Sequence, residues 1–427
     1  MFLSVHGGGM ERYDQLYELY EEHDTDTLRA LQDLADLFPL VESSVALDRW
    51  REINDELAEG KAGIEAAFPE VGEVFADLAT RARQEQAFAG LDLYNKYGRA
   101  VNVFVLDVDE TLRSTGSTDN EIPNETLNLI AKFHDRGVPI VICTGQTLEN
   151  VKGFAIQGLG SEIIHSGDFG IVYETGTGVF APGHGARTKQ LLYEDLDEGI
   201  QAVFDDVRAR VLSEAPDRLR KGCHLQGNEF NITMKPNFDT GSADAVAVID
   251  EALVYEIELL ADAVSGLDGV DVDGEAASEW TRAYYAEQDP EIRSVLQGED
   301  ALPDASAADV PSALEDVLER IDIGYYEGDA AEVGSLELTK VDGVEAAFDV
   351  LGIDDPFAVV MGDSKSDLRV MRWVQEHDAG IGAAPEHASQ AVLDHVRSTD
   401  DLVFDEGRAG DVLRTVYALN RLAEQSP

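Results

Sequence analysis

Val101-Asn-Val-Phe-Val-Leu106, followed at once by Asp107-Val-Asp109-Glu-Thr111-Leu112, is the stretch that decides how this chain folds. Its first half is a short run of β-branched and apolar residues, which is typical of a strand buried on both faces. A helical pattern follows over residues 127–133, and the next apolar run is Val138-Pro-Ile-Val-Ile-Cys143. Buried strands that alternate with helices predict a parallel sheet covered on both faces.

The same alternation returns toward the C-terminus. An apolar strand, Phe357-Ala-Val-Val-Met361, lies between helical patterns, and a last helical pattern covers 412–419. The material between the two halves differs, because it combines a helical pattern at 200–211, an alternating strand at 230–234 and a loop at 298–311. We therefore expect an α/β fold, with a Rossmann-like core in two parts and an inserted α+β domain. The expected boundaries are 99–165 and 335–427 for the core and 166–334 for the insertion.

Residues 1–98 show the periodicity of helices only. Apolar residues recur at helical spacing, for example at Leu28, Leu31 and Leu34. No polar cluster in this segment suggests chemistry. We therefore interpret it as an all-helical extension, either an accessory domain or a surface for a partner or for a second copy of the chain.

The charge of the chain restricts its partners. It carries 32 Lys and Arg against 85 Asp and Glu, a formal net charge of −53 over 427 residues. Such a surface repels nucleic acid and anionic membranes, so we expect neither as a partner. It also repels itself, but at about 1 M salt the Debye length falls to about 3 Å and screens the repulsion. The composition therefore resembles that of proteins from salt-accumulating halophiles.

The remaining composition indicates a globular protein of the cytoplasm. Apolar residues make up 44% of the chain, yet no window approaches the roughly 18 uninterrupted apolar residues of a membrane span. The two cysteines, Cys143 and Cys223, cannot build a disulfide framework. We expect Cys143 to be a buried strand residue rather than a nucleophile, because no positive side chain adjoins it.

Carboxylates gather where the predicted strands end. Asp107 and Asp109 follow the first strand and face the same way in an extended chain. Asp363 follows a later apolar strand, and Asp367 comes four residues on at a helix start. Acids brought together at one sheet edge need a cation or a proton to offset their repulsion, and Mg²⁺ suits such oxygen ligands. The alternative is a set of solvated acids, with Asp363 or Ser364 as a helix cap.

A phosphate site is predicted beside these acids. Thr144 and Gly145 follow the second strand, where a hydroxyl and free backbone N–H groups bind phosphate, although a plain helix N-cap is the alternative. Lys340, one of only nine lysines, ends a short run that leads into a helix. On its own, such a lysine would more often be a solvated side chain.

In order along the chain, these four stretches resemble the four motifs of the haloacid dehalogenase-like phosphatase superfamily, over about residues 99–427. The insertion between the second and third motifs resembles the type-IIB (Cof-like, sugar-phosphatase-like) cap of that superfamily. The sequence departs from the common pattern at Gln146, where many relatives carry a basic residue, at Val341, where Gly is usual, and at Ser366, where many have Asn.

The resemblance implies a role for each motif residue. Asp107 would attack phosphorus and form an aspartyl-phosphate, and Asp109 would act as general acid and then as general base. A proton donor at Asp109 also argues against true dehalogenation. Asp107, the backbone carbonyl of Asp109 and Asp363 would hold Mg²⁺, with Asp367 bound directly or through water. Thr144 with Gly145, and Lys340, would hold the phosphoryl oxygens.

The resemblance thus implies a phosphoric monoester hydrolase acting on a small metabolite, such as a sugar phosphate or phosphoglycolate. The insertion should set the substrate, and five of its polar residues are candidates to read sugar hydroxyls or a carboxylate: His224, Gln226, Asn228, Asn231 and Lys235. Simple solvation of these residues is the alternative. Two other functions stay open, namely a phosphomutase that uses the same intermediate and a non-catalytic regulatory protein that docks a partner through its N-terminal helices.

Overall fold

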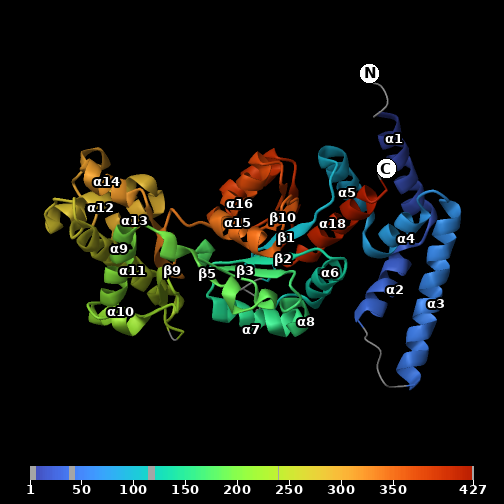
Figure 1. The fold of residues 1–427 in the computed structure, drawn as a ribbon, viewed down its shortest axis with the longest axis horizontal. Helices are drawn as coiled ribbons and strands as arrows, with labels where there is room; N and C mark the ends of the chain where they lie inside the picture. The colour runs from blue at the N-terminus through green and yellow to red at the C-terminus, as the bar shows by residue number, and fades with distance from the viewer. Residues whose placement is uncertain (1–5, 38–43, 114–120, 239, 426–427) are drawn as a thin grey trace.

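The computed structural model describes residues 6–37, 44–113, 121–238 and 240–425. The molecule has three parts in a row: an inserted domain at one end, a sheet core in the middle and the N-terminal helices at the other end (Figure 1). Among the helices that it describes, none is both long and apolar enough to cross a bilayer.

The core is an eight-stranded sheet with the order β12-β11-β10-β1-β2-β3-β4-β5. The central strand β1 pairs in parallel with β10 on one side and β2 on the other, as the buried runs predicted. Among the described strands of this sheet, only the β3-β4 and β4-β5 pairs are antiparallel. The strands are β1 (Val103–Leu106), β2 (Ile140–Cys143), β3 (Phe169–Tyr173), β4 (Gly178–Phe180), β5 (Gln190–Leu191), β10 (Ala358–Met361), β11 (Gly380–Pro385) and β12 (Leu402–Phe404).

Helices cover both faces of this sheet. Phe104 and Leu106 of β1 are fully buried on one face, and Val103 and Val105 are buried on the other. The first face packs against α6 (Asn124–Asp135), α7 (Leu148–Gly158), α8 (Gly160–Ile164) and α18 (Ala409–Ala423). The second face packs against α15 (Lys340–Leu351), α16 (Lys365–Glu376) and α17 (Gln390–Ser398). Both faces are apolar because period-2 alternation sends successive side chains to opposite sides.

The strands β3, β4 and β5 correct one expectation. The sequence pattern placed the start of the inserted domain at residue 166, but these three strands extend the core sheet. The reason is the run Phe169-Gly-Ile-Val-Tyr173, which is buried throughout and pairs in parallel with β2. A hairpin then adds β4 and β5, and the chain leaves the core only after them.

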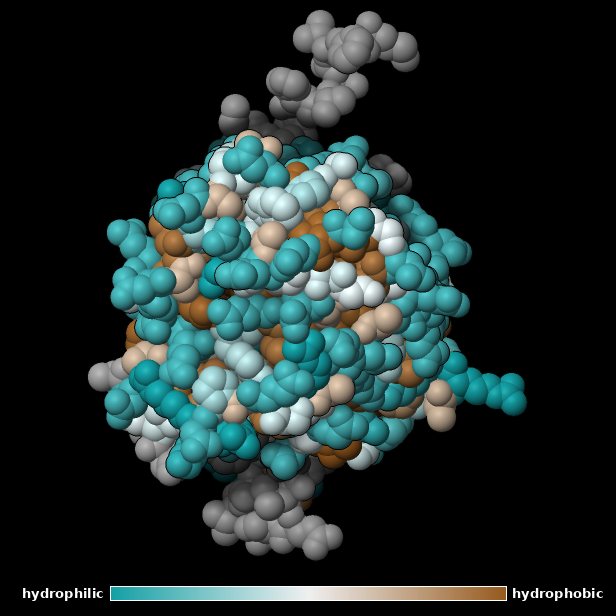
Figure 2. Space-filling view, turned by 90° about the vertical axis from the view of Figure 1, so that its left-hand side faces the viewer, coloured by the Kyte–Doolittle hydropathy of each residue, from teal (hydrophilic) through white to brown (hydrophobic). Residues whose placement is uncertain are grey.

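The inserted domain, called the cap below, has a four-stranded antiparallel sheet, β6-β7-β9-β8, and six α-helices among its described residues. The strands are β6 (Cys223–Leu225), β7 (Ile232–Pro236), β8 (Ile321–Tyr326) and β9 (Ala330–Ser335). The helices are α9 (Glu198–Arg210), α10 (Asp217–Gly222), α11 (Ser242–Ser265), α12 (Gly274–Gln288), α13 (Pro290–Gly298) and α14 (Ser312–Leu318). The outer surface at this end of the molecule is mostly hydrophilic, with apolar residues scattered over it (Figure 2).

The two faces of the cap sheet differ. Ile232 and Met234 of β7 point into the apolar core shared with the helices. Thr233 and Lys235 alternate with them and therefore lie on the opposite face. That face carries polar side chains and meets the edge of the core sheet, because Lys235 lines a cavity together with Asp109.

The N-terminal extension is helical, as predicted, and its apolar residues form a small core together with Ala418 and Leu422 of α18. Its helices are α1 (His6–Glu22), α2 (Thr25–Leu37), α3 (Ser44–Ala67), α4 (Gly72–Arg81) and α5 (Gln84–Tyr97). Leu34, expected on the buried face of α2, is 41% exposed instead. Helix α5 approaches α18 so closely that a Cβ at Gly90 would lie 2.8 Å from the Cβ of Ala418. The extension is therefore packed directly onto the core.

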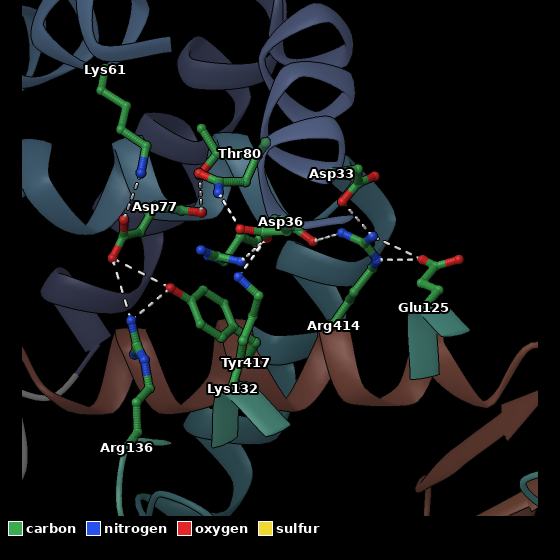
Figure 3. A network of polar contacts seen from close by, with 12 residues as sticks. Asp33, Asp36, Lys61, Asp77, Thr80, Glu125, Lys132, Arg136, Arg414 and Tyr417 are labelled. Carbon is green, nitrogen blue, oxygen red and sulfur yellow. Dashed lines mark hydrogen bonds and ion pairs between the residues drawn. The ribbon is translucent and has the colours of Figure 1, made fainter. Parts of the chain in front are cut away.

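A polar network fixes the extension to the core (Figure 3). Arg414 of α18 is only 5% exposed. Its guanidinium donates to Asp33 of α2 at 2.9 Å, to Glu125 of α6 at 2.9 Å and to the carbonyl of Arg81 at 2.6 Å. Asp36 likewise accepts from Arg81 at 2.9 Å and pairs with Lys132 of α6 at 2.5 Å. These contacts lie at the end of the core remote from the cap (Figure 1).

Arg414→Met is expected to lower the free energy of unfolding by about 1–3 kcal/mol, because the hydrogen bonds of the buried guanidinium to Asp33, Glu125 and the carbonyl of Arg81 are lost. Urea denaturation measures the loss. The control is Arg408→Met, since Arg408 is 43% exposed in its side chain and pairs with Asp411, three residues along the chain. That control should change stability by less than about 0.5 kcal/mol. If both variants lost the same free energy of unfolding, the network around Arg414 would contribute no more to stability than an exposed ion pair.

Candidate active site

Three of the predicted site residues, Asp107, Lys340 and Asp367, meet at the carboxyl edge of the core sheet. Lys340 lies at the first position of α15, and its Nζ is 2.9 Å from Asp107 Oδ1 and 2.6 Å from Asp367 Oδ1. The three residues are 2%, 6% and 2% exposed, respectively. They come from segments 27 to 260 residues apart in the sequence. The parallel pairing of β1 with β10 brings Asp107 and Asp367 together, and the packing of α15 on the sheet adds Lys340.

The loop after β1 is held by backbone and hydroxyl contacts. The amide of Asp107 donates to the carbonyl of Met361 at 2.9 Å, so the pairing of β1 with β10 continues to the nucleophile position. Glu110 then adopts a left-handed conformation, with φ of +56°. This turn places Thr111 so that its hydroxyl lies 3.2 Å from Asp107 Oδ2 and 3.3 Å from Asp363 Oδ1. Thr111 thereby bridges two acids, a role that the sequence pattern did not predict.

Two helix caps hold the other acids and the lysine. Thr339 caps α15 in a box with Asp342, which places Lys340 at the start of the helix. Ser364 caps α16 in a box with Asp367, and the Ser364 hydroxyl donates to Asp367 Oδ2 at 2.6 Å. Both carboxylate oxygens of Asp367 are therefore in use, one by Ser364 and the other by Lys340.

Burial dominates the electrostatics of the cluster. Burial raises the pKa of Asp107 well above its usual range, while Lys340 acts in the opposite direction. Burial and the nearby charge of Asp367 raise the pKa of Asp363 to about 6. Burial alone would lower the pKa of Lys340, but Asp107 and Asp367 outweigh it and raise that pKa, so the lysine stays cationic. Lys340 thus contacts two of the three carboxylates, Asp107 and Asp367, and a further positive charge would stabilise the cluster.

This donor set fits a divalent cation. Asp107, Asp363 and Asp367 each offer a carboxylate oxygen, and these oxygens lie within 4.8 Å of one another. Hard oxygen donors of this kind suit Mg²⁺. The buried hydroxyl of Ser389 has no hydrogen-bond partner among the described residues, although its backbone N–H donates to the carbonyl of Asp363 at 2.9 Å. Both oxygens of Asp367 accept short hydrogen bonds at 2.6 Å, whereas Asp107 Oδ2 and Asp363 Oδ1 have, within the part of the chain that the structure describes, only the longer contacts with Thr111, so Asp107 and Asp363 are the better direct ligands.

Asp109 stands apart from this cluster. Its Oδ1 accepts from Arg113 Nε at 2.9 Å and from Arg113 Nη2 at 2.7 Å, and its Oδ2 accepts from Gln146 Nε2. The side chain is 35% exposed, far more than that of Asp107. Gln146, a departure from the common family pattern, therefore contacts the predicted general acid. Neither partner of Asp109 was predicted from the sequence.

Thr144 is fully buried at the end of β2, where it was expected. Its hydroxyl accepts from the backbone N–H of Gln146 at 3.2 Å. The N-cap of α7 is Thr147, so the interpretation of Thr144 as a plain helix cap is wrong. Gly145 lies between them, and a Cβ there would come 3.4 Å from Thr175 Oγ1. Cys143, just before this loop, is buried, and burial raises its pKa as expected for a structural thiol.

A cavity of about 480 Å³ opens between Asp109 and the cap. The core contributes Asp109, Arg113, Gln146 and Asn150 to its lining, and the cap contributes His224, Gln226 and Lys235. Three of the five cap residues singled out from the sequence therefore face the candidate active site.

The other two cap candidates do not line this cavity. The amide of Asn228 is buried and donates to Thr233 Oγ1 at 2.8 Å. Asn231 is also buried and donates to the carbonyl of Glu174 at 3.2 Å. The carboxylate of Glu174 accepts from the amide of Phe230 at 3.0 Å, so this part of the chain joins the cap to the core. Sequence alternation alone did not separate these asparagines from the residues that line the cavity.

A second, larger cavity of about 620 Å³ lies along β8 and β9 on the other side of the site. Its lining includes Asp322, Tyr326 and Glu332 from the cap and Asp363 and Ser389 from the core. The cluster is therefore flanked by two openings of different chemical character.

Comparisons with known proteins agree with the motifs. Residues 104–168 match the haloacid dehalogenase-like hydrolase family. No curated protein sequence matches the chain. A phosphatase of the haloalkanoate (HAD) enzyme superfamily from Bacteroides thetaiotaomicron is 18% identical, with a TM-score of 0.41, over 75% of this chain and 96% of its own.

Two further solved structures are similar at the same level. Trehalose-6-phosphate phosphatase of Aspergillus fumigatus is 15% identical, with a TM-score of 0.40, over 78% of this chain and 97% of its own. A protein of Thermoplasma acidophilum is 12% identical, with a TM-score of 0.41, over 75% of this chain and 100% of its own. Similarity this distant says nothing about the substrate. The family match covers residues 104–168, in the first part of the core, and agrees with the resemblance that the four motifs carry to haloacid dehalogenase-like hydrolases.

Proposed function

We propose that this protein is a Mg²⁺-dependent phosphatase that hydrolyses a small phosphorylated metabolite through an aspartyl-phosphate on Asp107. The observation that carries the proposal is the buried contact of Asp107 with Lys340, beside Asp363 and Asp367. A nucleophilic carboxylate cannot approach a phosphate dianion unless positive charge offsets the repulsion. The lysine supplies part of this charge at the right place.

The chain's own residues account for both halves of the reaction. A carboxylate oxygen of Asp107 forms a bond to phosphorus while the bond from phosphorus to the leaving oxygen breaks. Asp109 gives a proton to that oxygen, and in the second half it takes a proton from the water that hydrolyses the aspartyl-phosphate. Thr144 and the backbone at Gly145 bind phosphoryl oxygens with Lys340. Asp367 and Thr111 position the lysine and the nucleophile.

Asp107 and Asp363 would hold Mg²⁺, and the backbone carbonyl of Asp109 completes the set implied by the family resemblance. When bound, the ion neutralises the phosphoryl charge and the carboxylates together. Asp367 keeps Lys340 in place, because its other oxygen is fixed by Ser364.

Phosphate release tests the proposal. The substrates are p-nitrophenyl phosphate and a panel of phosphorylated metabolites, in about 1 M KCl to screen the acidic surface, with and without Mg²⁺. We expect release that needs Mg²⁺ and that Asp109→Asn reduces by about 10²–10⁴-fold, most strongly for poor leaving groups. Failure of the folded protein to release phosphate from any substrate would sink the proposal. Retention of the group on a sugar bisphosphate would indicate a mutase.

Mg²⁺ should also stabilise the folded protein. Binding to the folded state alone raises its stability by about 2.7 kcal/mol when free Mg²⁺ is at 100 times the Kd. Asp363→Asn removes one of the two best ligands, so the shift in unfolding midpoint should largely disappear. Asp354→Asn, a change at an exposed acid, should keep the full shift. The measurement is thermal unfolding at constant ionic strength, and an unchanged shift in Asp363→Asn would place the ion elsewhere.

A further inference from the structure

We propose that the cavity beside Asp109 binds a second anionic group of the substrate, a carboxylate or a phosphate on the leaving group, through Arg113 and Lys235. This inference rests on the proposed phosphatase function and specifies its substrate class. The cavity has a volume of about 480 Å³ and lies between the core and the face of the cap sheet that carries Lys235.

The residues that line this cavity differ in charge from the chain as a whole. Acids outnumber bases by 85 to 32 in the sequence. In the cavity Arg113, Lys235 and the imidazole of His224 face a single acid, Asp109, among the described residues. Arg113 and Lys235 carry two positive charges against the one negative charge that Asp109 can carry, so the described lining is positive on balance. A positive pocket in so acidic a molecule attracts an anion that the rest of the surface repels.

The cap places its two basic groups side by side. His224 of β6 and Lys235 of β7 are register partners in the antiparallel ladder. Directly opposite residues of such a pair have Cβ atoms about 4.5–5.5 Å apart on the same face. The imidazole Nδ1 lies 3.2 Å from Asn237 Oδ1, which orients the ring. Together they form a donor pair on the cap, across the cavity from Arg113.

Arg113 already binds a carboxylate in this place. Its Nε and Nη2 both donate to Asp109, which shows that the guanidinium is turned toward the cavity wall that Asp109 shares. Lys235 pairs with Asp329 at 3.2 Å, but the side chain of Asp329 is 68% exposed and does not line the cavity. An exposed pair of this kind contributes little, so a substrate anion can replace it.

The opposite side of the cap face has the opposite charge. Glu332 of β9 is the register partner of Thr233, which donates to it at 2.5 Å, and Asp322 lies on β8 beyond it. Both acids line the second cavity. The cap face is therefore positive near Asp109 and negative near Asp363. An anionic substituent on the leaving group is directed to the Arg113 side.

Three phosphate esters of nearly equal size distinguish the effect of the substrate's charge from the effect of its shape. They are 2-phosphoglycolate, 2-hydroxyethyl phosphate and phosphoethanolamine, whose free ends are anionic, neutral and cationic. Glucose 1,6-bisphosphate against glucose 6-phosphate tests a second phosphate in the same way. In wild type we expect kcat/KM for at least one anionic ester to exceed that of its neutral or singly phosphorylated counterpart by about tenfold or more. Phosphoethanolamine should have the lowest kcat/KM of the three esters.

Lys235→Gln and Arg113→Gln should each reduce this preference to about threefold or less. Lys235→Gln is the decisive variant, because Lys235 does not touch Asp109, whereas Arg113 does. The control is Arg218→Gln, a loss of the same charge from an exposed cap side chain that pairs with Glu251, and it should leave the preference unchanged. All assays share one KCl concentration.

The outcomes distinguish the two proposals. Release of phosphate from p-nitrophenyl phosphate without any preference for anionic esters overturns the anion subsite and leaves the phosphatase intact. The anion subsite is equally overturned if Lys235→Gln keeps the full preference. No release from any ester, with Mg²⁺ present and the protein folded, overturns the phosphatase itself. A preference for the carboxylate or for the second phosphate identifies which anion the cavity takes.

Discussion

Asp107→Asn should reduce Mg²⁺-dependent phosphate release by about 10⁴-fold or more, the scale seen when a covalent nucleophile is removed. The amide cannot form the acyl phosphate, and it offers one weaker oxygen to a cation. The fold should survive, because Lys340 keeps its contact with Asp367 at 2.6 Å. Steady-state phosphate release and circular dichroism, measured on the same preparation, check both statements.

The matched control is Asp405→Asn, the same substitution at an exposed acid. It should retain full activity, because its side chain lies outside the cluster at the sheet edge. If Asp107→Asn kept more than about a hundredth of wild-type activity, the covalent route would be contradicted, and a water attack directed by Asp109 would be the better account.

Lys340→Met should both abolish activity and lower the free energy of unfolding by about 3–5 kcal/mol. Lys340 is 2% exposed and neutralises Asp107 and Asp367, so its removal leaves buried carboxylates without a partner. Urea denaturation measures the loss. Saturating Mg²⁺ should recover part of it, because the ion supplies positive charge to the same acids.

Lys365→Met provides the comparison for that variant. Lys365 starts the helix that carries Asp367, but its side chain is 73% exposed and lies 3.6 Å from Asp289. Its loss should change stability by less than about 0.5 kcal/mol. A small effect at Lys340, similar to that at Lys365, would mean that the acids are protonated in the folded protein and need no cation.

The convergence of Asp107, Thr144 and Asp363 could be predicted because it follows from topology, whereas Lys340 arrives at the first position of α15 after the chain returns from the cap sheet. Parallel strands end at one edge of a sheet, so residues that follow buried strands meet there whatever their distance in sequence. The same argument could not predict the residue at which the first core segment ends and the inserted domain begins. The strand Phe169–Tyr173 is followed by an antiparallel hairpin, and nothing in a local pattern says which sheet a hairpin joins.

The sequence also could not predict which side chains donate hydrogen bonds to the carboxylate of Asp109. Arg113 and Gln146 reach its carboxylate through long side chains whose direction depends on the tertiary fold. The same limit applies to the cap. His224 and Lys235 line the cavity, whereas Asn231, only four residues before Lys235, is buried at the joint between cap and core.

The extension was predicted as helices, but its site of attachment was not. The sequence suggested a docking surface for a partner or a second copy, and a role of that kind stays a prediction. The structure shows that part of its surface is already covered by the chain's own helix α18, through Arg414 and the close approach at Gly90.

That attachment has a consequence for how the protein is made. Asp33 and Arg414 are 381 residues apart in the chain. Ribosomes add about 5–20 residues per second, so the first helices wait about 20–80 s for the helix that completes their packing. During that time their apolar faces have no native cover from α18. A nascent chain of this protein is therefore most exposed to aggregation just before its last helix emerges, and chaperone binding to the early helices should end when α18 docks.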